Sequence, residues 1–500
     1  MKKATLVLAI ITAAQVGASA QQMLTLDDCH QMAVENSREL DQARQKIRMA
    51  EYDKKIAAAN YLPSISATGT YMYNSHDIAL LSDEASSALQ GMGDAVQSQI
   101  SGQMQQLMTA IKTNPAAAQE YMTSPMWQTV IGALSQTDVS AALNQIGTSI
   151  SEAFNLDMSN IYAGVISVQQ PLFVGGKIIA SNKMAALARD LSHVQYDLQY
   201  EDLLITVDEA YWQIVSVAQK KRLAEAYSDM LADMVRNAEI SVAEGIVTQS
   251  DLLAVKVKHN EARLLYSKAA NGLSLSKMLL CKQIGIPLDS DIVLADERDD
   301  EVPVPAQLVG KDMDSIISDR PETRSLELAS AIYDQKVKIA KADMMPKVAL
   351  SGNYVVSNPS MYNGFQKEFG GTFTAGVMVS VPLFHGTEAL QKTRKAKAEA
   401  AIYKSRYDDA CEMINLQVEQ LVKQRDEALE RLRMAESALD SAEENLRAAT
   451  IGFDEGIVNA NTTLQAQTAW MQAHSEYIDA GVELQMNHSK LLKAQGEYMK

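Results

Sequence analysis

The residues that could most readily bind a metal are the methionines, of which the chain has 25. Met104 and Met108 are four residues apart, as are Met122 and Met126, so each pair would share one face of a helix. Thioether sulfur suits Cu(I), and the pairs therefore suggest copper export as one hypothesis. Methionine at helical spacing is far more often a flexible packing residue, and we prefer that interpretation.

Catalytic side chains show no arrangement typical of an enzyme. The seven histidines form no H-x-x-x-H pair and no His/Cys cluster, which are common metal-ligand patterns. Serine, histidine and aspartate all occur, but the sequence has no G-x-S-x-G segment that would present a nucleophilic serine. We therefore expect no catalytic residue, no metal site, no cofactor and no enzymatic activity.

Charge and cysteine content narrow the function further. The formal net charge is −17, from 45 basic and 62 acidic residues, and no basic cluster stands out, so we expect no nucleic-acid binding. Acidic residues on the wall of a pore would favour cations. Cys29, Cys281 and Cys411 are far apart and odd in number, which argues against a disulfide framework and favours buried or helix-facing thiols.

Residues 1–20 have the pattern of a secretory signal peptide. Lys2 and Lys3 precede an apolar run, and Ala18-Ser19-Ala20 forms a cleavage site, so the mature chain should begin near Gln21. Because no cysteine follows this site directly, lipid attachment is not expected. No later apolar run is long enough for a membrane helix, which predicts an exported protein that is either soluble or a β-barrel.

Long helices are predicted on both sides of the middle of the chain. Apolar and small residues recur at steps of three and four over 203–241 and again over 414–449, a spacing typical of helices packed in a coiled coil. A helix from Lys177 to Glu244 would contain 68 residues and extend about 100 Å. A glycine then ends each long helix and the periodicity resumes. The chain should therefore form two long helical hairpins, over 177–285 and 388–500.

Four segments alternate apolar with polar residues, which predicts half-buried strands of about ten residues each. In the last of them, every second residue from Phe373 to Val381 is apolar. Prolines should mark the strand–helix junctions, because proline lacks the donor that a strand ladder needs. We expect the strands at about 64–74, 161–170, 347–357 and 372–381, with junctions at Pro63, Pro171, Pro346 and Pro382.

Four strands cannot close a barrel by themselves. An open sheet edge is not tolerated in lipid, since each unpaired backbone group there costs several kcal/mol. Two possibilities remain at this point: the sheet lies outside the membrane, or several chains combine their strands.

The second half of the chain repeats the first. Pro171-Leu172-Phe173 recurs as Pro382-Leu383-Phe384, and Glu244-Gly245-Ile246-Val247 recurs as Glu455-Gly456-Ile457-Val458, both at an offset of 382 − 171 = 211. This predicts an internal duplication with copies at 21–285 and 311–500, joined by an acidic linker or equatorial region at 286–310. The first copy has 72 extra residues between its strands, within about 74–160, and these should form a small helical cap on the outer side.

Together these features closely resemble the TolC-type outer membrane efflux proteins. The resemblance rests on the duplicated helix–hairpin–helix order, Asp319-Arg320-Pro321-Glu322, Gln170-Pro171-Leu172-Phe173 and the two glycine tips, and covers nearly the whole mature chain except the 74–160 insertion. It implies an α+β membrane protein of the Gram-negative outer membrane. Three chains would share a 12-stranded β-barrel in the lipid, continued by an α-helical tunnel in the periplasm.

The resemblance also implies a function. Such proteins are passive exit ducts for tripartite efflux or type I secretion, and they work with a periplasmic adaptor and an inner-membrane transporter. Adaptor docking would fall on the hairpin tips, which are Gly245, Ile246, Val247, Gly456, Ile457 and Val458. A periplasmic gate would fall on Asp251, Phe453, Thr462 and Gln465.

The second tip departs from the family pattern. Thr462 and Gln465 stand where family members have gate aspartates, and Val458 stands where they have arginine. Asp251 is open to two interpretations, as a gate residue or as an ordinary tip residue. A different class also remains open, namely a periplasmic coiled-coil structural or adaptor protein that is not inserted in the membrane.

Overall fold

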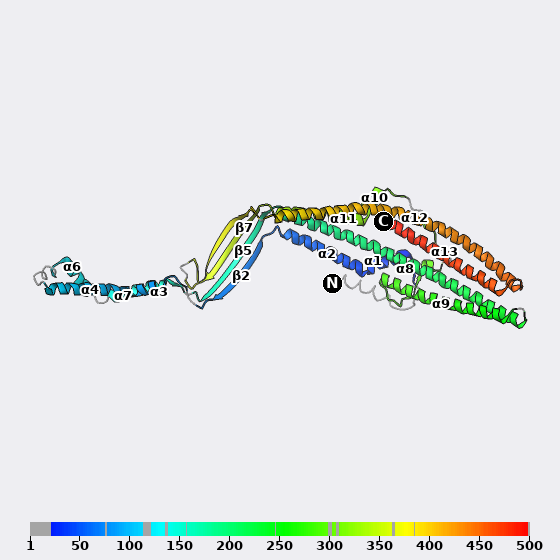
Figure 1. The fold of residues 1–500 in the computed structure, drawn as a ribbon, viewed down its shortest axis with the longest axis horizontal. Coiled ribbons are helices and arrows are strands. Elements are labelled where there is room, and N and C mark those ends of the chain that lie inside the picture. The colour runs from blue at the N-terminus through cyan, green and yellow to red at the C-terminus, as the bar shows by residue number, and fades with distance from the viewer. Residues whose placement is uncertain are drawn as a thin grey trace, which may run out of the picture. The chain divides into compact units, whose positions relative to one another are not determined.

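The computed structural model describes residues 22–75, 78–113, 122–135, 139–156, 158–245, 247–298, 303–306, 310–362, 366–384 and 386–498. The expected signal peptide therefore lies outside the described residues. The chain divides into two compact units (Figure 1). We call them the helical unit, which comprises Met1–Ala59, Gly176–Met344 and Phe384–Lys500, and the sheet unit, which comprises Asn60–Gly175 and Met345–Leu383.

Two long helical hairpins dominate the helical unit and confirm the heptad prediction (Figure 1). The long helices α8 and α12 have 67 residues each, so each extends about 100 Å. Each hairpin's long helix packs along its returning helix. The helices of this unit are α1 (Leu26–Asn36), α2 (Arg38–Ala59), α8 (Lys177–Ala243), α9 (Gln249–Ile284), α10 (Met313–Asp319), α11 (Pro321–Ala342), α12 (Glu388–Asp454) and α13 (Ala460–Ala494).

The largest core cluster of the helical unit surrounds the middle of α8. Tyr211 and Ile214 are fully buried there, together with Cys29 of α1 and Cys281 of α9, so both thiols pack as apolar side chains. A short parallel pair of strands closes this core, with β1 (Gln22–Leu24) beside β6 (Ile292–Leu294). Part of the segment expected as an acidic linker is thus a buried strand, because three apolar residues interrupt its acids.

The main sheet of the sheet unit is antiparallel, in the order β2-β5-β7-β8. All four strands occur where the alternation predicts them. The outer two, β2 and β8, are its edges, and the central pair joins the first and second halves of the chain. The strands are β2 (Ser64–Tyr73), β5 (Asn160–Val174), β7 (Lys347–Asn358) and β8 (Gly370–Ser380).

One predicted strand end was wrong. Pro171 lies inside β5, which continues to Val174 instead of ending at residue 170. The register with β7 shifts between Pro171 and Phe173, and such a bulge tolerates a residue without an N–H donor. The other three junction prolines lie outside the strands, with Pro63 and Pro346 just before β2 and β7 and Pro382 just after β8.

The insertion between β2 and β5 is helical, as its spacing predicts. A small antiparallel pair of strands, β3 with β4, stands at its base. Helix α7 packs against α3 and α4. The elements of the insertion are β3 (Ile78–Ala79), α3 (Asp83–Gln90), α4 (Met92–Thr113), α6 (Pro125–Ser135), α7 (Val139–Ala153) and β4 (Asn155–Leu156).

No helix within the described ranges is both long enough and apolar enough to cross a lipid bilayer.

Candidate functional site

The four-stranded sheet has one apolar face. Its register places Ile166 of β5 opposite Ala67 of β2 and Tyr354 of β7, and Tyr354 in turn opposite Phe373 of β8. The next rows are similar, so an apolar band crosses all four strands. Its large members are exposed in the single chain, for example Val377 at 62%. An exposed apolar surface of this size marks a site of contact with lipid or with another protein.

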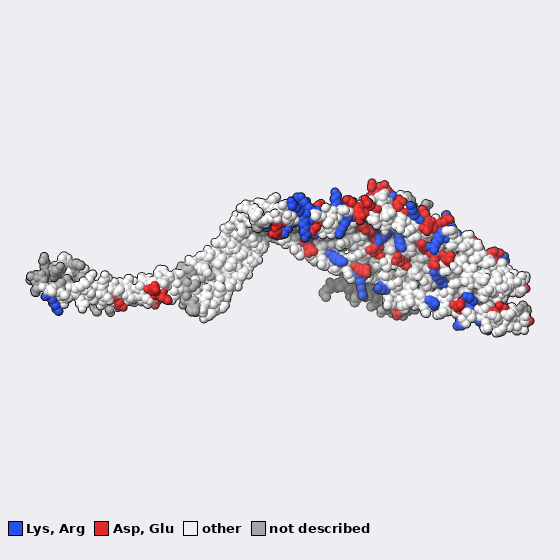
Figure 2. Space-filling view, in the orientation of Figure 1, with Lys and Arg blue, Asp and Glu red and all other residues white. Residues whose placement is uncertain are grey.

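The opposite face of the same sheet is more polar, although Val165 and Val355 also lie on it. Ser167 lies opposite Ser66 and Asn353, and Asn353 lies opposite Thr374. All residues of the four strands are described, and Lys347 at the start of β7 is the one charged residue among them. Figure 2 shows the visible face of the sheet as white along most of its length. The sheet therefore separates an apolar environment from a polar one with hydroxyls and amides instead of charges.

Both edges of this sheet are open. Among the residues that the structure describes, β2 pairs only with β5, and β8 pairs only with β7. Every residue of β2 is exposed. Each edge therefore presents a row of unpaired backbone donors and acceptors, which is a template for pairing with another strand.

The tip of the first hairpin is a glycine-stopped helix followed at once by a capped one. Gly245 has φ +74°, the left-handed conformation that glycine adopts freely, and its N–H donates to the carbonyl of Val242 at 3.1 Å. Thr248 then caps α9: its hydroxyl donates to the Asp251 carboxylate at 2.7 Å, and the Asp251 N–H donates to the hydroxyl at 3.2 Å. Ile246 lies outside the described residues.

The tip of the second hairpin repeats this backbone with different side chains. Gly456 has φ +73°, and the N–H of Val458 donates to the carbonyl of Gly452 at 2.9 Å. Asn459 caps α13 by accepting the N–H of Thr462 at 2.9 Å. Thr462 occupies the position that Asp251 has in the first tip, since 462 − 211 = 251. The second tip therefore lacks the negative charge that the first tip has at this position.

The predicted gate residues have separate environments in one chain. Phe453 packs against the buried cluster that contains Leu231 and Leu464. Thr462 and Gln465 are exposed, and the Asp251 carboxylate is used in its own helix cap. Within the described residues, no hydrogen bond or ion pair joins Asp251 to the other three. A gate made of these residues would therefore require neighbouring subunits.

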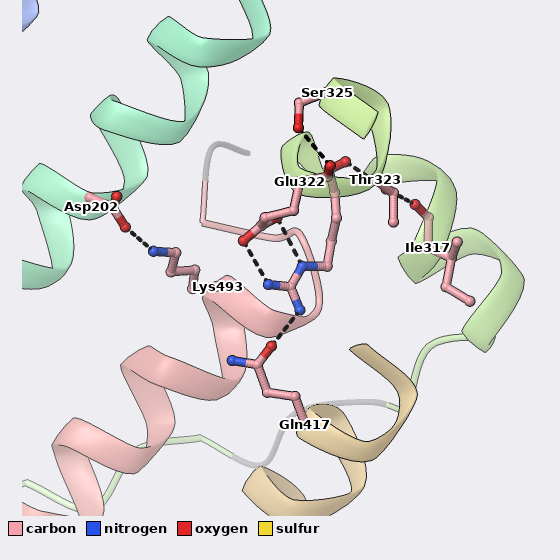
Figure 3. Close-up of polar contacts among 8 residues, drawn as sticks. Asp202, Ile317, Glu322, Thr323, Ser325, Gln417 and Lys493 are labelled. Atoms are coloured by element: carbon pink, nitrogen blue, oxygen red, sulfur yellow. Dashed lines mark hydrogen bonds and ion pairs between the residues drawn. The ribbon is translucent and has the colours of Figure 1, made fainter. Parts of the chain in front are cut away.

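A buried arginine explains the Asp-Arg-Pro-Glu motif. The guanidinium of Arg320, 3% exposed, donates to Glu322 through Nη2 at 2.7 Å and Nε at 3.1 Å, and to Gln417 of α12 through Nη1 at 3.0 Å (Figure 3). Pro321 is the first residue of α11, where its missing N–H is not needed. The motif thus starts α11 and attaches it to α12. Such a two-pronged bond to a carboxylate is among the stronger polar contacts.

An acidic side chain that the sequence reading missed lies near this arginine. Glu201 of α8 is 2% exposed, and burial, followed by the negative charge of Glu322, raises its pKa from 4.5 to about 7. Lys493 and Arg320 oppose this increase. Lys493 also forms an ion pair with Asp202, so α13 is linked to α8 here (Figure 3). The one feature of the sequence that could have indicated this buried acid is its position, since Glu201 lies just before the apolar stripe that begins at Leu203.

A second polar cluster connects both ends of the described chain to α8. The Asp208 carboxylate, 1% exposed, is 2.5 Å from Nε2 of His30, and it accepts a hydrogen bond from the Tyr498 hydroxyl. Burial and the Asp208 charge raise the pKa of Tyr498. Ser489 of α13 also forms a side-chain hydrogen bond with Tyr498. The cluster therefore fastens α1 and the C-terminal segment to α8. The described residues contain no group of three or more His, Cys, Asp or Glu placed to hold a metal ion.

Comparison with known proteins adds the family. The model of the family "Outer membrane efflux protein" matches residues 133–280 and 313–497. The chain belongs to this family. The match begins inside the insertion and leaves most of it outside, including α3 and α4.

A curated relative and two solved structures support the assignment. The chain is 26% identical over 319 residues to the alkaline protease secretion protein AprF of Pseudomonas aeruginosa, which covers 63% of this chain and 65% of that relative. The outer membrane protein VceC of Vibrio cholerae has a TM-score of 0.68 at 14% identity, covering 94% of this chain and 96% of that one. The open-state MtrE outer membrane channel of Neisseria gonorrhoeae has a TM-score of 0.69 at 16% identity, covering 95% and 89%. The mostly helical fold with a few strands is shared with these channels.

Proposed function

We propose that this chain is one subunit of a homotrimeric exit duct in the outer membrane of a Gram-negative cell. Three sheets would join edge to edge into a 12-stranded barrel, continued by a helical tunnel in the periplasm. The observation that carries this proposal is the open, two-faced sheet, because pairing β8 of one copy with β2 of the next would remove every exposed edge. The apolar face would then meet lipid and the polar face would line the pore.

The dimensions of the sheet support a membrane location. Strand β8 has 11 residues, which at about 3.4 Å per residue and a tilt of about 40° gives a height of roughly 28 Å. The apolar band of a membrane barrel is about 25 Å high. Aromatic residues occur at both ends of β5, with Tyr162 5.0 Å from the Tyr71 ring at one end and Phe173 at the other. Rings at the two water–lipid boundaries are a property of membrane barrels.

Matching lengths support the duplication. The two long helices have 67 residues each, the returning helices α9 and α13 have 36 and 35, and α2 and α11 have 22 each. Three duplicated chains would supply six similar hairpins to one tunnel. We propose domain limits of 21–285 and 311–500 for the two copies, with 286–310 between them.

The expected partners are a periplasmic adaptor, an inner-membrane transporter and outer membrane lipid. Adaptor docking is proposed at the two tips, whose shared backbone would offer similar surfaces around Gly245 and Gly456. The gate is proposed at Asp251, Phe453, Thr462 and Gln465, which neighbouring subunits would bring together. The name of AprF indicates protein secretion, so a polypeptide is one substrate class for this duct, and efflux of small molecules is the other.

The charge-free apolar face gives a sharp test. Val377→Arg should disfavour insertion by about 2–4 kcal/mol if this residue faces mid-bilayer lipid, whereas Thr374→Arg on the polar face of the same strand should be tolerated. The measurement is the amount of trimer extracted from outer membranes by detergent, with single-channel conductance in planar bilayers for the wild type. Equal trimer yields for both variants would instead support the alternative, a periplasmic coiled-coil structural or adaptor protein that is not inserted in the membrane. Wild-type protein that washes off the membranes without detergent would support the same alternative.

A further inference from the structure

Helix α7 of the insertion packs through its small and polar residues. A Cβ added at Gly147 would lie 1.8 Å from the carbonyl oxygen of Leu89, so α7 approaches the end of α3 as closely as backbone allows. One turn earlier, the side chain of Asn144 accepts the N–H of Gly93 at 2.7 Å. Ser140 donates to Asp94 at 2.8 Å. Residues 140, 144 and 147 share one face, and this face is occupied by α3 and α4.

The neighbouring face of α7 is apolar and uncovered. Val139, Ile146, Ile150 and Phe154 follow each other at steps of seven, four and four, so they form one stripe about 23 Å long. Ile146 is 52% exposed and Phe154 is 45% exposed. An amphipathic helix normally buries such a stripe and exposes its serines and asparagines. In α7 the opposite arrangement leaves the apolar stripe about half exposed.

We propose that the apolar stripe of α7 packs against the insertion of a second copy of this chain, so that the three insertions of one trimer form a single helical bundle. This inference rests on the proposed trimeric barrel. It adds a second subunit interface, outside the strands, made by α7, which lies within the family match, while its partners α3 and α4 lie outside it.

The insertion is anchored at the rim of the sheet. The N–H of Asn74 donates to the carbonyl of Ser159 at 2.9 Å, and β3 pairs with β4, so the ladder between β2 and β5 continues into the insertion. The N–H of Leu80 donates to the carbonyl of Phe154 at 3.0 Å, which attaches the end of α7 to the same base. Because β2 is a sheet edge, the insertion begins on the strand that would form the proposed subunit boundary.

Barrel geometry brings identical insertions within reach of each other. Twelve strands spaced about 4.8 Å apart and tilted about 40° give a circumference of about 75 Å and a diameter of about 24 Å. Three equivalent points on that rim are then about 21 Å apart. One helix with its side chains is about 10–12 Å across, so a pair of helices is about 20 Å wide. Three such pairs on one rim would therefore touch.

Charge favours this occupant over a phosphate-bearing lipid surface. Residues 74–160 contain eight acidic residues and one lysine, so an anionic surface would repel them. The stripe itself is uncharged, and the visible face of the insertion has few charged side chains (Figure 2). A second copy offers the same uncharged stripe, which would be removed from water on both sides.

The test uses the full-length protein in outer membranes, with photoreactive benzoylphenylalanine in place of Ile146 or, as a matched control, in place of the exposed Gln145 on another face of α7. Irradiation at 146 should give a product of twice the chain mass whose crosslinked peptide lies within 75–160 of a second copy, at least fivefold more than at 145. A crosslink to a different protein, or equal yields at both positions, would overturn the inference.

Native mass spectrometry in detergent separates this inference from the proposed function. A trimer that lacks the crosslink would reject only the inference, whereas a monomer would reject both. A second measurement uses Ile146→Ser combined with Ile150→Ser, which leaves the face toward α3 and α4 intact. Amide exchange in α7 should be at least tenfold faster in this variant trimer than in the wild type. Unchanged exchange would contradict a covered stripe.

Discussion

The two long helices α8 and α12 have the same length but very different surroundings. Helix α8 packs against α1, α2, α9, α11 and α13, whereas α12 packs chiefly against α11 and α13. Accordingly, α8 contains 21 buried residues and α12 contains nine. The same heptad pattern therefore produces a central helix in one half of the chain and a peripheral helix in the other.

The difference shows where a neighbour would bind. Helix α12 exposes large apolar side chains that a solvated helix would lack, such as Leu416 at 61%. Helix α9 does the same, with Leu275 at 67%. In the proposed trimer these two helices are candidates for the subunit boundary, and burial there would bring α12 closer to the state of α8. The comparison can be tested residue by residue.

The largest effect is expected from truncating the core of α8. Leu231 is fully buried, so Leu231→Ala should lower the unfolding free energy by about 2–5 kcal/mol and lower the melting temperature of the helical signal in detergent. Leu416→Ala in α12 should change the unfolding free energy of the dissociated chain by less than about 0.5 kcal/mol. The same variant should reduce the fraction of the protein that assembles into trimers. Equal melting shifts for the two variants in the dissociated chain would remove the distinction between the helices.

The buried acid of α8 gives the next effect, and it depends on pH. Because folding raises the pKa of Glu201 from 4.5 to about 7, its contribution to stability is complete below pH 4.5 and is lost as the pH rises to 7. Glu201→Gln removes this dependence and should stabilise the protein at pH 8 by up to about 3 kcal/mol, while leaving stability at pH 4.5 nearly unchanged.

A matched control exists for this variant in α12. Glu412 is the counterpart of Glu201 at the offset of 211, and it is exposed. Glu412→Gln should therefore change stability by less than about 0.5 kcal/mol. Melting curves of both variants between pH 4.5 and 8 provide the measurement, and a parallel pH profile for Glu201→Gln and the wild type would disprove the assignment.

The tip glycines should show a smaller effect, equal in both hairpins. Apart from the adjacent residues in the chain, no atom of the described residues lies within 4 Å of a Cβ built at Gly245 or Gly456, so the positive φ is the main obstacle to a side chain. Alanine at either position should cost about 1–2 kcal/mol, and asparagine, which tolerates this conformation, should cost less. Melting measures the cost in stability, and crosslinking to the proposed periplasmic adaptor measures docking. A larger loss of docking than of stability would support a tip contact.

The smallest effect concerns the difference between the tips. Asp251→Ala removes a capping-box carboxylate and should destabilise α9 by about 0.5–1 kcal/mol, and Thr462→Asp should stabilise α13 by about 0.3–1 kcal/mol through the charge near its N-terminus. Helix melting measures both changes, and channel conductance tests the proposed gate. Unaltered conductance in both variants would favour an ordinary capping role for Asp251.

Periodicity made most of the fold predictable. The long helices and the four strands follow from steps of three and four and of two, which depend only on neighbouring residues. Pro171 was misjudged because the bulge that accommodates it is set by the partner strand β7. The strand β6 was missed because three apolar residues are too few to show alternation, and its burial depends on β1, far away in sequence.

The candidate sites were less predictable for the same reason. Glu201 has an unusual environment because tertiary packing buries it and brings the charges of Glu322 and Arg320 near it, and neither of these residues is close to it in sequence. From the sequence alone, the apolar stripe of α7 would be predicted to lie in a core. The structure shows that α3 and α4 instead pack on the adjacent face of α7. By contrast, the stop at Gly456 is local, because glycine alone adopts its backbone conformation without strain.

The two open edges of the sheet do not by themselves set the number of subunits. In the proposed assembly, β8 of one chain pairs with β2 of a neighbouring chain. Such a head-to-tail interface either closes into a ring or extends into an open filament, depending on the angle between successive chains. Hydrogen bonds between two edge strands fix the register of the pair, but they constrain the angle between successive chains only weakly. In the proposed trimer, lateral packing between the long helices of neighbouring chains would set this angle and so the number of subunits. A newly exported chain would therefore need to fold its long helices before its edge strands pair with those of another copy.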